Sequence, residues 1–303
     1  MNDLNEIKSK VPDLELLARQ VVDGFIIGLH KSPFHGFSVE FAEHRLYNPG
    51  DNLRHVDWKV YGRSDKMFSK KYEEETNLRC CIAIDTSSSM SFESAERISK
   101  LEASVQAAAC IIELLRRQMD ASSVALFDEQ LYLMTRSGTS SGHKSLLFSH
   151  LEQARKKRPG QAASTNAAQA IHELAERLHQ RSLVVIFSDM LEGSEDTDQL
   201  ISGLQHLKHN KHEIILFMVG DKKLEWDFEL SNRPVELRDM ETQDTIKLQP
   251  EAVTRTYREA VSRYIHFLSE QCARMNIDFQ LFDIHDPPEE MLRIYLMKRM
   301  KMM

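Results

Sequence analysis

The sequence lacks several features that would place it in a common class of protein. Its longest apolar runs are only a few residues, far short of the roughly 20 that a transmembrane helix needs. It has no excess of basic residues, because the net charge is −7, so bulk electrostatics does not favour nucleic-acid binding. Met1 to Pro12 is polar and charged, unlike the apolar core of a secretory signal. We therefore expect a cytoplasmic protein with no membrane span and no nucleic-acid partner.

Cysteine is scarce, and its four positions form no C-x-x-C pair. Cys80 and Cys81 are neighbours in an apolar run that is typical of a strand, so their side chains would point to opposite faces. Cys110 and Cys272 are isolated in the sequence. We expect all four to be buried free thiols in a reducing compartment.

Sequence signatures of hydrolytic catalysis are also missing. The 13 histidines include no H-E-x-x-H pattern, and the run Ser87-Ser88-Ser89 is not the G-x-S-x-G turn of a serine hydrolase. These absences favour a binding protein over an enzyme.

Alternating strand and helix patterns from residue 78 onward predict an α/β fold with a doubly wound, mostly parallel sheet. The predicted elements are strands at 78–84, 124–127, 131–135, 183–187, 213–219 and 279–284, helices at 101–119, 144–155, 167–180, 197–207 and 252–275, a hairpin at 234–248 and a final helix after Pro288. Before them, an apolar stripe at helical spacing predicts a helix, and short segments rich in turns and charges follow. We therefore expect two parts, an N-terminal helical and short-strand appendage at 1–77 and the α/β domain at 78–303.

The most informative stretch runs from Cys80 to Met90, where an apolar run ends in Asp85 and hydroxyls follow at Ser87 and Ser89. In open parallel sheets, ligands bind beyond the carboxyl ends of the strands. One carboxylate with two neutral hydroxyls is an oxygen ligand set that suits Mg²⁺ or Mn²⁺ better than Zn²⁺. For either serine alone, capping of the next helix is the alternative interpretation.

This pattern resembles the metal-ion-dependent adhesion site (MIDAS) of von Willebrand factor A domains, which has a further Thr and a further Asp on later loops. The polar loop at 158–166 contains Thr165, with Ser164 as the alternative, and a second buried strand ends at Asp189. The resemblance implies that the hydroxyls bind the ion directly, that Asp side chains hold it through waters, and that an acidic side chain of a partner completes the octahedron. The expected metal ligands are Asp85, Ser87, Ser89, Thr165 and Asp189. We expect Ser87 to be an exposed ligand.

A second motif lies between His35 and Trp58. Together with the predicted strand that ends at Asp85, it resembles a von Willebrand factor A-like family of unknown function (the domain of unknown function 58 type). The genes of that family commonly accompany MoxR-type AAA+ ATPases. The matching residues are Glu40-Phe41, Arg45, Tyr47, Pro49-Gly50-Asp51, Arg54, Val56-Asp57-Trp58, Lys70, Lys71, Tyr72 and Glu73-Glu74-Glu75, with Val56 standing where the family usually has Ile. We expect Arg45, Arg54, Asp51 and Asp57 to form a charged network that locks this segment onto the domain, with Trp58 as its apolar anchor.

Together these resemblances imply a non-enzymatic, metal-dependent protein-interaction module. The partner would be a MoxR-type AAA+ ATPase or its client, and the role that of a chaperone-like adaptor. The alternative is a metal-dependent, phosphatase-like hydrolase that uses Asp85. Such enzymes of the haloacid-dehalogenase type place a second Asp two residues later as the general acid, and here that position is Ser87.

The C-terminal tail from Met291 to Met303 is basic and apolar. It is interpreted as a terminal helix packed on the sheet, with a membrane-surface or helix-docking segment as the alternative.

Overall fold

The computed structural model describes residues 13–31, 44–46, 68–70, 78–91, 98–156, 167–179, 181–190, 196–230, 235–238 and 245–302. The chain divides into two compact units, one of Met1–Gly24 with Leu78–Met303 and the other of Phe25–Asn77. Within its described residues, the second unit contains an antiparallel pair of short strands, β1 (His44–Leu46) and β2 (Phe68–Lys70). The division at 1–77 and 78–303 stays a prediction.

Within the described residues, the first unit is built on a six-stranded sheet in the order β10-β7-β6-β3-β4-β5. All neighbouring strands pair in parallel except the last pair, because β5 runs antiparallel to β4. The strands are β3 (Arg79–Asp85), β4 (Ala121–Phe127), β5 (Leu131–Met134), β6 (Leu183–Ser188), β7 (Glu213–Gly220) and β10 (Asp278–Asp283). This confirms the predicted mixed α/β fold with a mostly parallel sheet.

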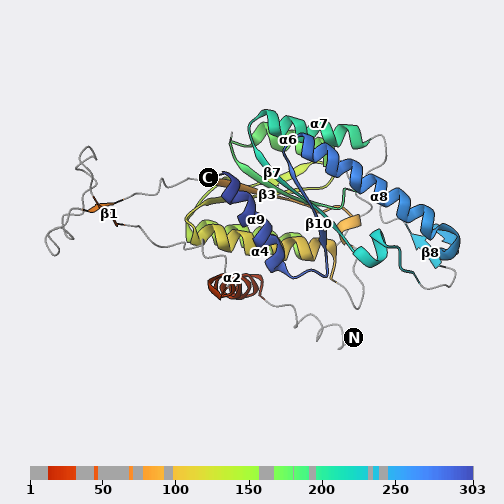
Figure 1. Cartoon of the computed structure of the whole chain (residues 1–303), viewed down its shortest axis with the longest axis horizontal. Helices are drawn as coiled ribbons and strands as arrows, with labels where there is room; N and C mark the ends of the chain where they lie inside the picture. The colour runs from red at the N-terminus through yellow and green to blue at the C-terminus, as the bar shows by residue number, and fades with distance from the viewer. Residues whose placement is uncertain are drawn as a thin grey trace. The chain divides into compact units, whose positions relative to one another are not determined.

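The central strands are continuous apolar runs because helices cover both faces of the sheet. Figure 1 shows α6, α7 and α8 on one side of it and α4 and α9 on the other. The helices are α4 (Lys100–Arg117), α5 (Ser141–Lys156), α6 (Ala167–Arg177), α7 (Asp196–His209), α8 (Pro250–Arg274) and α9 (Pro288–Met302). On the first side Ala83 and Ile186 pack with Ile171 and Leu204. Among the side chains outside that cluster, Phe187 and Phe217 stack at 4.9 Å between ring centroids.

The N-terminal helix α2 (Leu14–Lys31) buries Leu14, Ala18 and Val22. These residues are four positions apart, so they share one helix face. Polar contacts add to this packing, because Glu15 Oε1 accepts a hydrogen bond from Lys144 Nζ at 2.8 Å.

The final helix buries Leu292 and Tyr295. Lys298 Nζ lies 2.8 Å from Glu213 Oε2 on β7 and 3.0 Å from Asp278 Oδ2 on β10. The predicted terminal helix packed on the sheet is therefore confirmed.

Several predicted boundaries shift, and one element has no sequence signal. The helix predicted from Lys144 begins at Ser141, because the Ser140 hydroxyl accepts the His143 amide and caps the turn. The hairpin is confirmed as β8 (Val235–Arg238) and β9 (Thr245–Leu248). A one-turn π-helix, η3 (Lys222–Trp226), follows β7 and was not predicted.

Among the described residues, no helix combines the length and the apolar character that a bilayer crossing requires.

Candidate metal centre

The carboxylates of Asp85 and Asp189 lie at the ends of β3 and β6, where the order of the strands in the sheet changes direction. The chain leaves β3 for β4 on one side, whereas β6 lies on the other side of β3. Ligands of open parallel sheets bind at such a switch point, beyond the carboxyl ends of the strands. Asp85 is the last residue of β3 and Asp189 directly follows β6. Because Ile84 is in register with Phe187, Asp85 lies opposite Ser188, and Asp189 follows one residue further along the neighbouring strand.

Asp85 is fully buried and is held in one orientation by two hydrogen bonds. Its Oδ1 accepts the Ser87 amide at 2.9 Å, and its Oδ2 accepts the Ser188 hydroxyl at 2.7 Å. Burial, and then repulsion from Asp189, raise the pKa of Asp85 to about 7, although these hydrogen bonds act in the opposite direction. A nearby positive charge would stabilise the ionised form, so the position favours a cation.

Two hydroxyls lie beside this carboxylate. Ser87 Oγ and Ser89 Oγ are 3.1 Å apart, and Ser89 begins a short 3₁₀ turn, η2 (Ser89–Ser91). The expectation that Ser87 is exposed is wrong, because it is fully buried. η2 packs against α4, and Ser89 at its start is partly exposed. Ser89 therefore has the more accessible of the two hydroxyls.

Specific hydrogen bonds fix both loops of the site. The Thr86 amide and hydroxyl donate to the Phe127 carbonyl at 2.8 and 2.9 Å, which ties the first loop to β4. After Asp189, Met190 has a φ of 52°, a left-handed conformation that is uncommon outside glycine. Its amide donates to Ser188 Oγ at 3.2 Å and its carbonyl accepts the Tyr264 hydroxyl at 2.5 Å.

Asp189 binds a buried lysine that the sequence did not indicate. Lys100, the first residue of α4, places Nζ 2.8 Å from Asp189 Oδ2 and 2.8 Å from Glu225 Oε1 on η3. Its side chain is only 7% exposed. Burial alone would lower the pKa of Lys100, but the charges of Asp189 and Glu225 outweigh it and raise that pKa above its usual value. The lysine is therefore a fixed positive charge beside the candidate metal ligands.

The structure brings together four of the five predicted ligands: Asp85, Ser87, Ser89 and Asp189. Thr165 and its alternative Ser164 lie outside the described residues, as do Arg54, Asp51, Asp57 and Trp58 of the predicted charged network. Arg45 is described only as a backbone position in β1. Hydroxyl and carboxylate oxygens are hard donors, so the four described residues fit Mg²⁺ or Mn²⁺.

Sequence reasoning missed Lys100, Ser188 and Glu225. Ser188 carried a usable signal, because it is the residue in register with Asp85 once β3 and β6 are paired. Lys100 and Glu225 carried none, because no sequence pattern marks the contact that their side chains make.

A second group of ligand-type side chains lies at the ends of β7 and β10. One atom from each of Asp221, Asp283 and His285 falls within 4.8 Å of the others. Both carboxylates accept hydrogen bonds from backbone amides. Asp221 Oδ1 accepts one from the Leu224 amide at 3.0 Å, and Asp283 Oδ1 accepts one from the His285 amide at 3.2 Å. These bonds cap η3 and the turn after β10, which is a sufficient structural role.

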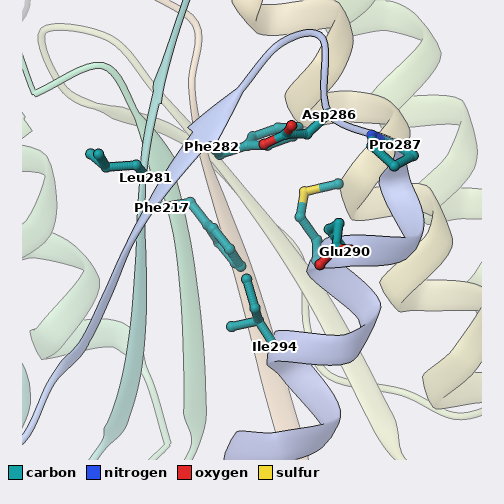
Figure 2. Close-up of a pocket in the computed structure, with 8 residues that line it drawn as sticks. Phe217, Leu281, Phe282, Asp286, Pro287, Glu290 and Ile294 are labelled. Atoms are coloured by element: carbon teal, nitrogen blue, oxygen red, sulfur yellow. The ribbon is translucent and has the colours of Figure 1, made fainter. Parts of the chain in front are cut away.

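A pocket of about 310 Å³ lies between the edge of the sheet and α9 (Figure 2). Phe217 and Ile294 line it, while Asp286 and Glu290 contribute acidic groups. None of its lining residues belongs to the candidate metal centre.

Comparison with known proteins gives relatives whose names state no activity. An uncharacterized protein of Mycobacterium tuberculosis (Rv1480) and one of Mycobacterium bovis (Mb1516) are each 35% identical over 98 residues. That match covers 32% of this chain and 31% of the length of each relative. Among solved structures, the conserved hypothetical protein BatB from Bacteroides thetaiotaomicron aligns with a TM-score of 0.49 at 12% identity, over 74% of this chain and 98% of that one.

The family comparison covers far more of the chain. The matching family is described as "Protein of unknown function DUF58", and its model matches residues 43–265, which include β3, the candidate ligands Asp85, Ser87 and Ser89, and Asp189. The chain belongs to this DUF58 family.

Proposed function

We propose that this chain is a von Willebrand factor A-like protein-interaction module that holds Mg²⁺ or Mn²⁺ at Asp85, Ser87, Ser89 and Asp189. Thr165, or Ser164 in its place, would complete the protein ligands. The main support is the convergence of two buried carboxylates with two neutral hydroxyls at the switch point of a parallel sheet.

The balance of charge supports a divalent ion in particular. Within the described residues, the site and its contacts contain three carboxylates, Asp85, Asp189 and Glu225, against one ammonium, Lys100. If all are ionised, these four groups together carry a net charge of −2. Burial makes such an excess costly, and a divalent cation would neutralise it.

The proposed partner is a protein that offers an acidic side chain to the ion. Mg²⁺ prefers octahedral geometry and keeps exchangeable waters, so one position can pass to a ligand from outside. By its resemblance to the MoxR-associated family, the chain would serve a MoxR-type AAA+ ATPase or its client as an adaptor. The partly exposed Ser89 marks the side from which that ligand would approach.

A phosphatase-like hydrolase using Asp85 is the second candidate. The buried Lys100 favours it, because a lysine near a carboxylate and a metal can bind a phosphate. The residue two positions after Asp85 argues against it, since Ser87 supplies no carboxylic acid to protonate a leaving group. We therefore propose binding rather than catalysis.

Cation binding is tested first on stability. A ligand that binds only the folded state stabilises it by about 2.7 kcal/mol at a concentration 100 times its Kd. Mg²⁺ or Mn²⁺ should raise the unfolding midpoint of the wild type but not that of Asp85→Ala. The matched control is Glu129→Gln, an exposed acid in the turn after β4 that should keep the full rise. An equal rise in Asp85→Ala would refute the site.

Partner binding and catalysis need separate measurements. A MoxR-type ATPase should be captured in Mg²⁺ and released by EDTA, and Ser89→Ala should weaken that capture. Capture that is indifferent to both changes would refute the adhesion mechanism. Turnover of a generic phosphate ester that disappears in Asp85→Asn would instead establish the hydrolase.

A further inference from the structure

Lys100 joins the candidate metal centre to a distant segment of the chain. Its Nζ contacts Asp189 and Glu225 at the same distance of 2.8 Å. These acids come from different elements: Asp189 follows β6, whereas Glu225 belongs to η3 after β7. One ammonium is therefore shared between a metal-ligand carboxylate and a carboxylate that is not a predicted ligand.

The segment at the other end of this connection is compact and contains a natural reporter. Glu225 Oε2 accepts the Asp221 amide at 2.9 Å, which closes the turn. Trp226 lies directly against the end of β7, since a Cβ on Gly220 would be 2.8 Å from its Nε1. A movement of Glu225 would therefore change the surroundings of the Trp226 indole.

A cation and Lys100 would compete for the same carboxylate. Two positive charges on Asp189 repel each other, and this repulsion is strong where solvent is excluded. Glu225 offers the ammonium an alternative partner that it already contacts, so the lysine can retain a counter-charge when a cation takes Asp189.

We propose that Lys100 couples cation occupancy at Asp85 and Asp189 to the conformation of η3, by shifting its pairing from Asp189 toward Glu225. This inference rests on the proposed function, because it needs a cation at the site. It identifies η3 (Lys222–Trp226) as a surface whose structure reports whether the site is loaded. Linkage makes the coupling reciprocal, so a contact that draws Lys100 toward Glu225 would also tighten cation binding.

The test uses the full chain labelled with 5-fluorotryptophan and titrated with Mg²⁺. The sequence has two tryptophans, Trp58 and Trp226, so ¹⁹F spectra contain two resonances, which Trp226→Phe assigns. The Trp226 resonance should move with cation concentration and saturate with the binding isotherm. Direct binding is followed separately with Mn²⁺ by electron paramagnetic resonance.

Three variants separate coupling from a simple change of charge. Lys100→Met should bind Mn²⁺ more tightly, by between about 5-fold and 150-fold, the usual range of coupling between sites, and Trp226 should stop responding. Lys100→Arg keeps the charge and should keep the response. Glu225→Gln should bind more weakly and also lose the response, and it serves as the test if Lys100→Met does not fold.

The outcomes distinguish the two proposals. If neither the wild type nor any variant binds a cation, the proposed function and this inference both fail. If cations bind but Trp226 is silent in the wild type, or responds equally in Lys100→Met or Glu225→Gln, only the coupling is refuted and Lys100 is a static ion-pair partner.

Discussion

Replacing Asp85 by Asn should stabilise the protein in the absence of divalent cations. In the folded state, burial and then the charge of Asp189 raise the pKa of Asp85 from 3.8 to about 7. Each unit of raised pKa corresponds to about 1.4 kcal/mol, so the ionised carboxylate costs roughly 4 kcal/mol of stability above pH 7. Asparagine removes that charge but disturbs the hydrogen bond from Ser188, which offsets about 1 kcal/mol.

The dependence on pH has a definite sign. A raised carboxyl pKa means that the folded state binds more protons than the unfolded chain between about pH 4 and pH 7. Wild-type stability should therefore fall across that window, while the stability of Asp85→Asn lacks this component. The advantage of the variant should grow by about 3 kcal/mol between roughly pH 5 and pH 8, and the hydrogen-bond term cancels in this difference.

The same substitution at Asp189 should act in the opposite direction. Asp189→Asn removes one of the two carboxylates that neutralise the buried Lys100. Breaking one side of a buried ion pair typically costs about 3–5 kcal/mol. Urea unfolding in EDTA at two pH values measures both variants. An Asp85→Asn protein less stable than the wild type near pH 8, or an Asp189→Asn protein more stable, would refute this account of the site.

Three further substitutions test a buried acid on α4 and the identity of the fifth metal ligand. Glu113 is a buried acid on α4. Although burial raises the pKa of Glu113, hydrogen bonds from Arg116, Lys144 and Arg117 lower it to about 2. Glu113→Gln should therefore cost about 3 kcal/mol of stability at neutral pH, and urea midpoints should show that difference shrinking as the pH falls from 4.5 toward 2. Thr165→Val should weaken Mn²⁺ binding measured by electron paramagnetic resonance while Ser164→Ala leaves it unchanged; the reverse result would assign the hydroxyl ligand to Ser164.

The fold was predictable because its signals are local. The run Cys80 to Ile84 is apolar on both faces, as expected of a strand that is covered by helices on both sides. The structure places this strand inside the sheet, with all five residues buried. Helix ends were less predictable, because a cap can move them by a turn. The Ser140 cap starts α5 three residues before the predicted position and places Gly142 inside the helix.

The candidate ligands were predictable for a different reason. Their positions follow from the rule that parallel strands present their carboxyl ends at one edge, so two strands ending in Asp must bring those acids together. Lys100 obeys no such rule. Its position depends on two tertiary contacts: the packing of α4 over the sheet, and the ion pair with Glu225 on η3. Neither contact produces a periodic pattern in the sequence that could be detected.

The asymmetry between the two carboxylates explains how a site with so many acids could accept another acid. Asp189 already contacts Lys100, whereas no described ammonium contacts Asp85. If Asp85, Asp189 and Glu225 are all ionised, Lys100 and a divalent ion together bring the charge of this group to zero. The same group without Lys100 would keep one negative charge and would repel a carboxylate from a partner. The buried lysine would therefore permit the proposed interaction, because its charge offsets the negative charge that would otherwise repel the partner's carboxylate.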